Sequence, residues 1–276
     1  NDSYVLQAKS LQCARIVLPE FSVTATENII MAAVLAKGVT VIELAAAEPH
    51  VQDLCNFLNK LGADITGIGS HLLTIKGVEQ LGGGEHTIIP DMIEAGTWAV
   101  LGAVGRGAIT IGPIVPEHLS IVLYKLKEIG VDFSVDDNNL TVRASRQLKP
   151  FKLQTMPYPG FATDLQAPFS VLATQAGGSS LIHDPLYEGR LNHIAELVKM
   201  GANAIVADPH RVVINGPTPL YGREIRSFDL RAGATLIIAG LIAEGETLIH
   251  DLEIVDRGYQ NLVERLTALG AKVTRV

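Results

Sequence analysis

The chain has 276 residues, of which 47% are apolar and 18% are charged, and its formal net charge is −7. This length and hydrophobicity suffice for one or two buried cores and argue against intrinsic disorder, while an acidic chain without a basic run does not fit a nucleic-acid-binding protein. Two cysteines cannot form a disulfide framework, and residues 1–12 hold no apolar segment of a secretory signal. A cytoplasmic location is the resulting expectation.

One pattern of elements recurs along the whole chain. A glycine ends the second helix of each repeat, at Gly62, Gly130, Gly201 and Gly270. The glycines stand roughly 70 residues apart, which is longer than ordinary solenoid repeats. Each repeat, or cassette, is predicted to run approximately β-α-β-α-β-β, so the chain is predicted to hold four cassettes of an α/β fold.

The first helix of a cassette is apolar on nearly all sides, as in residues 29–36, 99–104 and 235–243. A glycine turn and a strand follow the first helices, beginning at Gly38, Gly107, Gly178 and Gly245. Helices that are apolar all round are typical of burial within a bundle or against a sheet. At under about 12 residues each, they are too short to span a membrane.

The second helices have a single apolar stripe and are predicted to pack one face on a core. The stripes are Leu54, Leu58 and Leu61; Leu119, Leu123 and Leu126; Ile194, Leu197 and Val198; and Leu262, Val263, Leu266 and Leu269. Alternating segments at 72–76, 140–143 and 211–215 predict strands near the cassette ends. Cys13 and Cys55 border such apolar runs and are predicted to be small, buried or half-buried residues.

Familiar catalytic signatures are missing from the sequence. The eight histidines include no His-Glu-x-x-His pattern, so we expect no metal. The Gly82-Gly83-Gly84 run is followed by neither a Lys-Ser/Thr pair nor a helix start, and it is predicted to be a plain turn. No cofactor is expected from these patterns.

Polar residues open the first helices, at Ser22, Asp91, Asp164 and Asp229. N-capping is the simplest role for them, since Ser and Asp caps contribute about 1 kcal/mol each. Arg231 follows Asp229 in the first turn, where the helix dipole disfavours a cation by about 0.3 to 1 kcal/mol. Arg190 and Arg257 stand at the starts of second helices. Each arginine alone fits a structural ion pair, but three at equivalent helix entrances favour a site for an anion such as a phosphate ester.

Seven short stretches, taken in their order and spacing, give the chain a specific resemblance. They are Phe21–Asn28, Ala47–Pro49, Pro90–Thr97, Phe161–Ala167, Tyr187–Arg190, Asp229–Ala232 and Asp256–Tyr259. With them the sequence resembles the UDP-N-acetylglucosamine 1-carboxyvinyltransferases, the enolpyruvyl transferases that open peptidoglycan synthesis in the bacterial cell wall.

The resemblance implies an inverted α/β barrel, with helices inside and strands outside. The family has six cassettes in two pseudo-threefold domains, of which four are present in this sequence. Residues 1–88 would be the last cassette of the amino-terminal domain, and residues 89–276 three cassettes forming most of the carboxy-terminal domain. The family's Lys-Asn pair for phosphoenolpyruvate and its mobile loop with the general acid would lie in the part that has no counterpart in this sequence.

The resemblance also implies a reaction and its residues. The enolpyruvyl group of phosphoenolpyruvate moves to the 3-hydroxyl of UDP-N-acetylglucosamine by addition and elimination, and phosphate leaves. The implied catalytic residues are Asp164 as the candidate base, Asp229 as a second carboxylate near the reacting centre, and Arg257. The implied substrate-binding residues are Ser22 and Val23 at the nucleotide diphosphate, Leu186 through its backbone, and Asp164, Arg190, Arg231 and Arg257.

Other readings of the sequence stay open beside this one. The chain could be a catalytically incomplete fragment that acts as a scaffold or as a weak sugar-nucleotide binder. It could also belong to the related shikimate branch of the enolpyruvyl transferases, although Ala47–Pro49 and Thr163–Gln166 favour the sugar-nucleotide branch. A cassette without the rest of its domain is expected to expose apolar helix faces, so self-association is expected.

Overall fold

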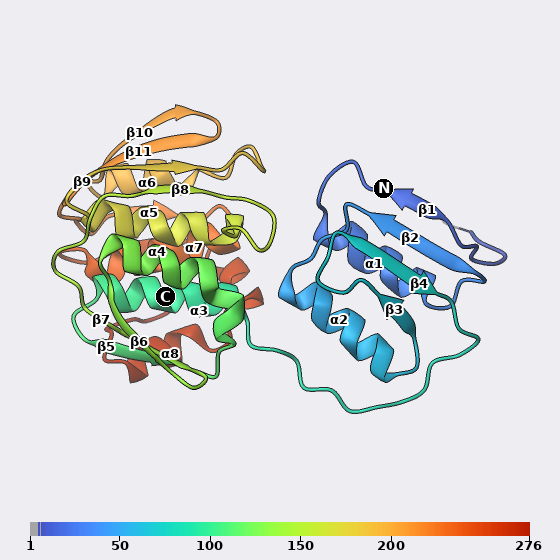
Figure 1. Cartoon of the computed structure of the whole chain (residues 1–276). Coiled ribbons are helices and arrows are strands. Elements are labelled where there is room, and N and C mark those ends of the chain that lie inside the picture. Colours follow the sequence, from blue (N-terminus) through green and yellow to red (C-terminus); the bar gives the residue numbers. More distant parts are fainter. Residues whose placement is uncertain (1–4, 6) are drawn as a thin grey trace. The chain divides into compact units, whose positions relative to one another are not determined.

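The computed structural model describes residue 5 and residues 7–276. The chain divides into two compact units, which are described separately (Figure 1). Unit 1 contains the described residues up to Ile89 together with Pro157–Pro159, and unit 2 contains Pro90–Met156 and Gly160–Val276. No helix in the described part of the chain has the length and apolarity needed to cross a membrane.

Unit 1 is a single complete cassette. Its elements are β1 (Arg15–Val17), α1 (Val23–Ala33), β2 (Val39–Glu43), α2 (Pro49–Lys60), β3 (Asp64–Thr66) and β4 (Leu72–Lys76). The strands form one sheet in the order β1-β2-β4-β3, in which only the β1–β2 pair is parallel. Every second residue of β2 and β4 is buried, and Ile30 of α1 packs with Ile42 and Ile75 in the core beneath that face.

Unit 2 contains the other three cassettes. The second cassette has α3 (Met92–Val104), β5 (Ala108–Ile111), η1 (Pro116–Leu119), α4 (Ser120–Ile129), β6 (Asp132–Asp136) and β7 (Asn139–Arg143). The third has β8 (Lys152–Gln154), η2 (Thr163–Leu165), α5 (Gln166–Gln175), β9 (Gly178–His183), α6 (His193–Lys199), β10 (Asn203–Asp208) and β11 (Arg211–Gly216). The fourth has β12 (Glu224–Arg226), α7 (Leu230–Ile242), β13 (Leu248–His250), η3 (Glu253–Arg257) and α8 (Leu262–Ala268).

The sheets of unit 2 repeat the strand order of unit 1. Their orders are β8-β9-β11-β10, β5-β7-β6 and β12-β13, and the opening pair is again parallel in the third and fourth cassettes. The predicted six-element pattern is therefore complete in the first and third cassettes. It is wrong for the second, where residues 77–91 form the connection from unit 1 and contain no strand, and for the fourth, where residues 271–276 contain no strand.

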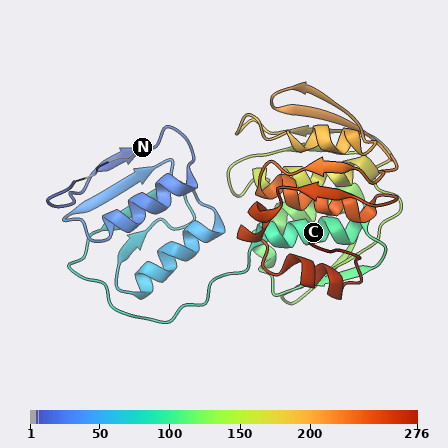
Figure 2. The same ribbon diagram turned by 180° about the vertical axis from the view of Figure 1, so that it is seen from behind.

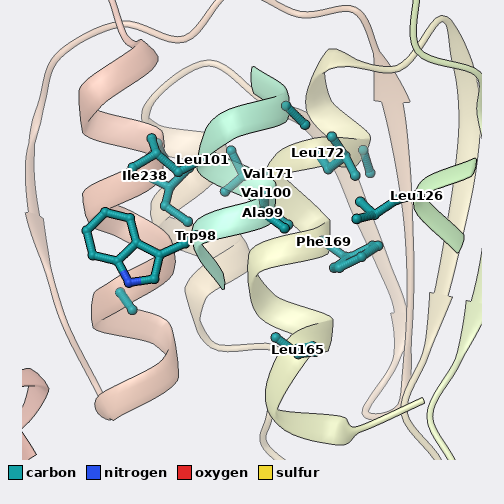
Figure 3. Packing of buried hydrophobic residues seen from close by; sticks show 14 of the residues in the cluster. Trp98, Ala99, Val100, Leu101, Leu126, Leu165, Phe169, Val171, Leu172 and Ile238 are labelled. Atoms are coloured by element: carbon teal, nitrogen blue, oxygen red, sulfur yellow. The ribbon is translucent and has the colours of Figure 1, made fainter. Parts of the chain in front are cut away.

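Three helices, α3, α5 and α7, pack against one another inside unit 2, with the sheets outside them (Figures 1 and 2). Figure 3 shows Trp98 of α3 and Ile238 of α7 between these two helices, and Phe169 on the side of α5 that faces Leu126 of α4. All of α5 except Gln175 is buried. This inside-out α/β arrangement is the expected one, and among the described residues the sheets remain separate rather than joining into one closed barrel.

The first helix of unit 1 departs from the prediction of burial on several sides. In α1 the buried residues are Thr26, Ile30 and Ala33, which form one stripe, while Met31 on another face is 50% exposed. The prediction is wrong for α1 because no other cassette packs within unit 1 to cover its second face.

The glycines predicted to end the second helices do so, and all adopt the left-handed conformation, with φ between 88° and 107°. The prediction that the stripes of the second helices are buried is wrong at two residues, since Val198 and Leu269 are 44% and 51% exposed. Leu269 lies beyond the last residue of α8, and the buried face of α6 consists of His193, Ile194, Glu196 and Leu197 instead. Cys55 is buried as predicted, whereas Cys13 is exposed because it precedes the edge strand β1.

Candidate active site

One carboxylate and two arginines meet in unit 2. Asp164 lies in the turn η2 at the start of α5, Arg190 in the loop between β9 and α6, and Arg231 in the first turn of α7. Asp164 Oδ1 lies 2.8 Å from Arg190 Nη1, and its Oδ2 lies 2.9 Å from Arg231 Nε. The structure thus brings together three of the residues that the sequence singles out.

The charges of this cluster are only partly screened by solvent, because the side chain of Asp164 is 30% exposed and that of Arg231 is 16% exposed. Burial by itself raises the pKa of Asp164, but the charges and hydrogen bonds of Arg231 and Arg190 outweigh it and hold that pKa below its ordinary value. Conversely, burial lowers the pKa of Arg231, and Asp164 outweighs that effect, so the pKa is raised. The carboxylate is therefore ionised at neutral pH.

The Arg190 backbone is fixed from the interior of unit 2. Its carbonyl oxygen accepts a hydrogen bond of 2.8 Å from the amide of Gln166, which is 1% exposed. His193 also forms a hydrogen bond with the Arg190 backbone, and its Nε2 lies 2.8 Å from Ser170 Oγ. Burial lowers the pKa of His193 to about 4, so this ring is a neutral member of the scaffold.

Tyr259 joins α3 and α7 beside the cluster. Its ring is 1% exposed, and its hydroxyl lies 2.9 Å from Thr97 Oγ1 and 3.5 Å from the donating Arg231 Nη1. The Arg231 guanidinium lies 5.9 Å from the ring centroid. Tyr259 belongs to the Asp256–Tyr259 stretch, but no role was predicted for it. The feature that could have indicated one is an aromatic residue with a polar end directly after a glycine.

The predicted N-caps are confirmed at three helices and wrong at Asp164. Asp229 Oδ1 accepts the N–H groups of Arg231 and Ala232 at 2.8 Å, while its Oδ2 forms no hydrogen bond with the described residues. Asp91 caps α3 through the N–H of Ile93 at 2.7 Å. Asp164 is not a cap, because both of its oxygens bind arginines.

Two further candidates of unit 2 stand outside the ion-pair cluster. Arg257 is exposed at the end of η3 and forms no ion pair with any residue that the structure describes, while its neighbour Asp256 pairs with Arg275. The N–H of Leu186 is already donated to Asp184 Oδ1 at 3.1 Å. The backbone atom of Leu186 that remains for a ligand is therefore its carbonyl oxygen.

Ser22 and Val23 belong to unit 1. Ser22 caps α1, accepting the N–H of Ala25 at 3.2 Å, and Val23 is the first residue of the helix. The first turn of α1 contains no acidic side chain, so the positive end of the helix dipole is not offset there. This helix start has the character of an anion site, with a hydroxyl and backbone N–H groups as donors.

The arrangement in unit 2 suits an anionic substrate. Arg190 and Arg231 supply two positive charges beside the Asp164 carboxylate, and the exposed Arg257 lies at the end of η3, which packs against α7 behind its Asp229 cap. Among the described residues there is no group of three His, Cys, Asp or Glu side chains that could hold a metal ion.

The sequence matches the family model described as EPSP synthase (3-phosphoshikimate 1-carboxyvinyltransferase) over residues 3–266. The chain belongs to the EPSP synthase family. The resemblance seen in the sequence is confirmed at the level of the family by this match, whose description names a carboxyvinyltransferase.

Relatives narrow the similarity within the EPSP synthase family. The chain is 47% identical over 270 residues to UDP-N-acetylglucosamine 1-carboxyvinyltransferase 2 of Bacillus cereus, a match that covers 98% of this chain and 63% of the relative. It is 48% identical to UDP-N-acetylglucosamine 1-carboxyvinyltransferase 1 of Caldanaerobacter subterraneus subsp. tengcongensis, covering 98% and 65%. The chain thus spans less than two thirds of the length of these curated relatives.

Solved structures of family members agree with the fold. The enolpyruvyl transferase NikO from Streptomyces tendae superposes with a TM-score of 0.88 at 26% identity, covering 98% of this chain and 66% of NikO. EPSP synthase from Acinetobacter baumannii superposes with a TM-score of 0.75 at 22% identity, covering 96% and 64%. The second likeness concerns the fold alone.

Proposed function

We propose that this chain is part of a UDP-N-acetylglucosamine 1-carboxyvinyltransferase, which transfers the enolpyruvyl group of phosphoenolpyruvate to the 3-hydroxyl of UDP-N-acetylglucosamine for peptidoglycan synthesis. The observation that carries the proposal is the ionised Asp164 held between Arg190 and Arg231. Relatives at 47% and 48% identity carry that name, which favours the sugar-nucleotide branch over the shikimate branch.

In this proposal residues 1–88 complete the amino-terminal domain and residues 89–276 form most of the carboxy-terminal domain. The general acid and the Lys-Asn pair for phosphoenolpyruvate come from the part of the enzyme that has no counterpart in this sequence. Ser22 and Val23 at the start of α1 bind the nucleotide diphosphate, and the carbonyl of Leu186 binds the sugar nucleotide.

Asp164 is the proposed base for the sugar hydroxyl. The 3-hydroxyl oxygen adds to C2 of phosphoenolpyruvate while C3 takes a proton from the general acid, and loss of a C3 proton with phosphate then restores the double bond. Paired with two arginines, Asp164 is a weak base. An incoming phosphate or carboxylate that draws Arg190 and Arg231 toward itself raises the pKa of Asp164, so the base is strengthened when the substrates are bound.

The remaining carboxylate and cation complete the proposed site. Asp229 keeps one oxygen free of the helix cap, which suits a part in the elimination of phosphate. Arg257 is exposed and available to the departing phosphate or to the substrate carboxylate.

The proposal is tested by phosphate release from phosphoenolpyruvate and UDP-N-acetylglucosamine, with each substrate omitted in turn and with shikimate 3-phosphate in place of the sugar nucleotide. We expect no release by the chain alone, and sugar-dependent release when the amino-terminal third of a close relative is added. Release with shikimate 3-phosphate instead would contradict the assignment to the sugar-nucleotide branch.

Binding separates the transferase from a scaffold. We expect calorimetry to detect UDP-N-acetylglucosamine binding by this chain, weakened about tenfold or more by Arg231→Gln, which removes a charged contact. The matched control is Arg226→Gln, because Arg226 is exposed and pairs with Asp251 rather than with Asp164. Absence of both binding and restored phosphate release would leave only the scaffold reading.

A further inference from the structure

A second carboxylate, Asp184, lies behind the cluster and takes no part in the proposed chemistry. It follows β9 directly and is fully buried, with an exposed fraction of 0%. An ionisable group in such a place costs free energy unless hydrogen bonds replace its water. The surroundings of Asp184 provide these bonds from three separate segments.

The three donors fill both oxygens of Asp184. Oδ1 accepts the hydroxyl of Thr155 at 2.7 Å and the N–H of Leu186 at 3.1 Å, and Oδ2 accepts the hydroxyl of Thr163 at 2.5 Å. Its own backbone is tied to the turn before β11, because its N–H donates to the His210 carbonyl at 2.8 Å and its carbonyl lies 2.7 Å from His210 Nδ1. Asp184 is thus held by hydrogen bonds through both its side chain and its backbone.

Two of the three donors adjoin residues of the candidate site. Thr163 precedes Asp164 in the turn η2, and Leu186 opens the loop that leads to Arg190. Asp164 and Arg190 in turn form the ion pair of 2.8 Å. The third donor, Thr155, is buried after the end of β8 and adjoins no candidate residue.

We propose that Asp184 is a positioning residue, whose buried carboxylate holds the Asp164 turn and the Leu186–Arg190 loop in register so that base and arginine meet. A carboxylate suits this role because it accepts bonds at both oxygens, and bonds to a charged acceptor are about twice as strong as neutral ones. The geometric part is independent of the reaction, while its consequence for sugar-nucleotide binding rests on the proposed function.

The test compares two threonines that bind the same carboxylate. Thr163→Val and Thr155→Val each remove one hydroxyl donor to Asp184 while keeping the side-chain shape. Thr163→Ser keeps the hydroxyl at position 163 and removes only a methyl group. The pKa of Asp164 is measured in the full chain by carboxyl ¹³C NMR, with the resonance assigned through Asp164→Asn. Urea unfolding of each variant establishes that the folded state is the one titrated.

We expect Thr163→Val to raise the pKa of Asp164 toward its ordinary value, because the carboxylate loses its alignment with Arg190 and Arg231. Thr155→Val and Thr163→Ser are expected to leave that pKa in place. Equal shifts in the two valine variants, or no shift in either, would overturn the proposal and leave Asp184 a general contributor to stability.

Affinity for UDP-N-acetylglucosamine gives a second readout by calorimetry. We expect about tenfold weaker binding for Thr163→Val, less than about twofold for Thr155→Val, and recovery in Thr163→Ser. Equal weakening in the two valine variants would overturn the positioning role. If the unsubstituted chain shows neither binding nor restored phosphate release, the proposed function fails, while the NMR titration still decides the role of Asp184.

Discussion

The cassette of unit 1 and the third cassette, in unit 2, have the same strand order but treat their first helices differently. Met31 of α1 is 50% exposed, and Leu35, just after the end of α1, is 51% exposed. In contrast, α5 is buried everywhere except at Gln175. Both helices are rich in apolar residues, although α1 also contains the charged Glu27, so apolar content alone does not explain the contrast. What differs is the number of cassettes, since α5 packs against α3 and α7 while α1 has no counterpart of these within unit 1.

The largest effect is expected in the hydrophobic core of unit 2. Phe169 of α5 is 0% exposed and packs edge-on against Phe151 and Phe161. Phe169→Ala should lower the free energy of unfolding of unit 2 by about 3–5 kcal/mol, because it removes a large side chain and leaves a cavity. Urea unfolding with a probe in each unit measures this loss.

The matched substitution on the exposed face of α1 is Met31→Ala, for which a change within about 0.5 kcal/mol is expected. Similar losses for the two substitutions would mean that α1 is as enclosed as α5, which would remove the contrast between the units.

The pH dependence should also distinguish the units. Burial lowers the pKa of His193 to about 4, below its ordinary 6.5, so the unfolded chain binds a proton that the folded unit 2 does not. The stability contributed by the neutral ring is complete above pH 6.5 and is lost as the pH falls toward 4, roughly 3 kcal/mol in all.

Urea unfolding at pH 7 and pH 5 measures this dependence, and His193→Gln should flatten it in unit 2 alone. A pH dependence that persists unchanged in His193→Gln would assign it to other groups.

A smaller effect is expected at the contact of α3 with the start of α5. A Cβ on Gly96 would lie 2.7 Å from Leu165 Cδ1, so Gly96→Ala should destabilise unit 2 by about 1–3 kcal/mol through overpacking. Gly107→Ala is the control, since no atom lies within 4 Å of its added Cβ and its φ is not left-handed. Thermal unfolding should give a lower midpoint temperature for Gly96→Ala than for Gly107→Ala. Equal midpoints would show that the contact between α3 and Leu165 can accommodate an added methyl group.

The smallest effect on folding is expected on the open face of α1, where the consequence is association instead. Met31→Lys and Leu35→Lys should change the stability of unit 1 by no more than about 0.5 kcal/mol, yet raise the concentration at which the chain self-associates. Light scattering over a concentration series measures this. Val198→Lys, on an exposed apolar residue of unit 2, is the control. A clean monomer of the unsubstituted chain at high concentration would contradict the expectation.

Local signals in the sequence predicted local structure well. The glycines after the second helices, the strand at Leu72–Lys76 and the caps at Ser22, Asp91 and Asp229 depend on neighbouring residues and are confirmed. The exposure of α1 could not be predicted from its pattern, because the pattern records hydrophobicity and not how many helices are present to cover it.

The candidate site could be predicted only in part, because its contacts join residues that lie far apart in the sequence. Asp164 was predicted to cap a helix, but it pairs with arginines 26 and 67 residues away, and the three-dimensional fold alone decides which of its neighbours it meets. Tyr259 and Asp184 were missed for the same reason, since their partners Thr97 and Thr155 lie 162 and 29 residues away.

The hydroxyl contact between Tyr259 and Thr97 has a consequence for the order in which parts of the chain can fold during synthesis. Unit 1 has its complete sheet once Lys76 has left the ribosome, so its cassette can close early in synthesis. In unit 2 the second cassette must wait for the fourth, because Thr97 and Glu94 find Tyr259 and Arg265 only after more than 160 further residues. Contacts of such long sequence separation form slowly. Arg231 of the cluster can meet Tyr259 only after that residue has been made, and the apolar faces of α3 and α5 depend on α7 to cover them.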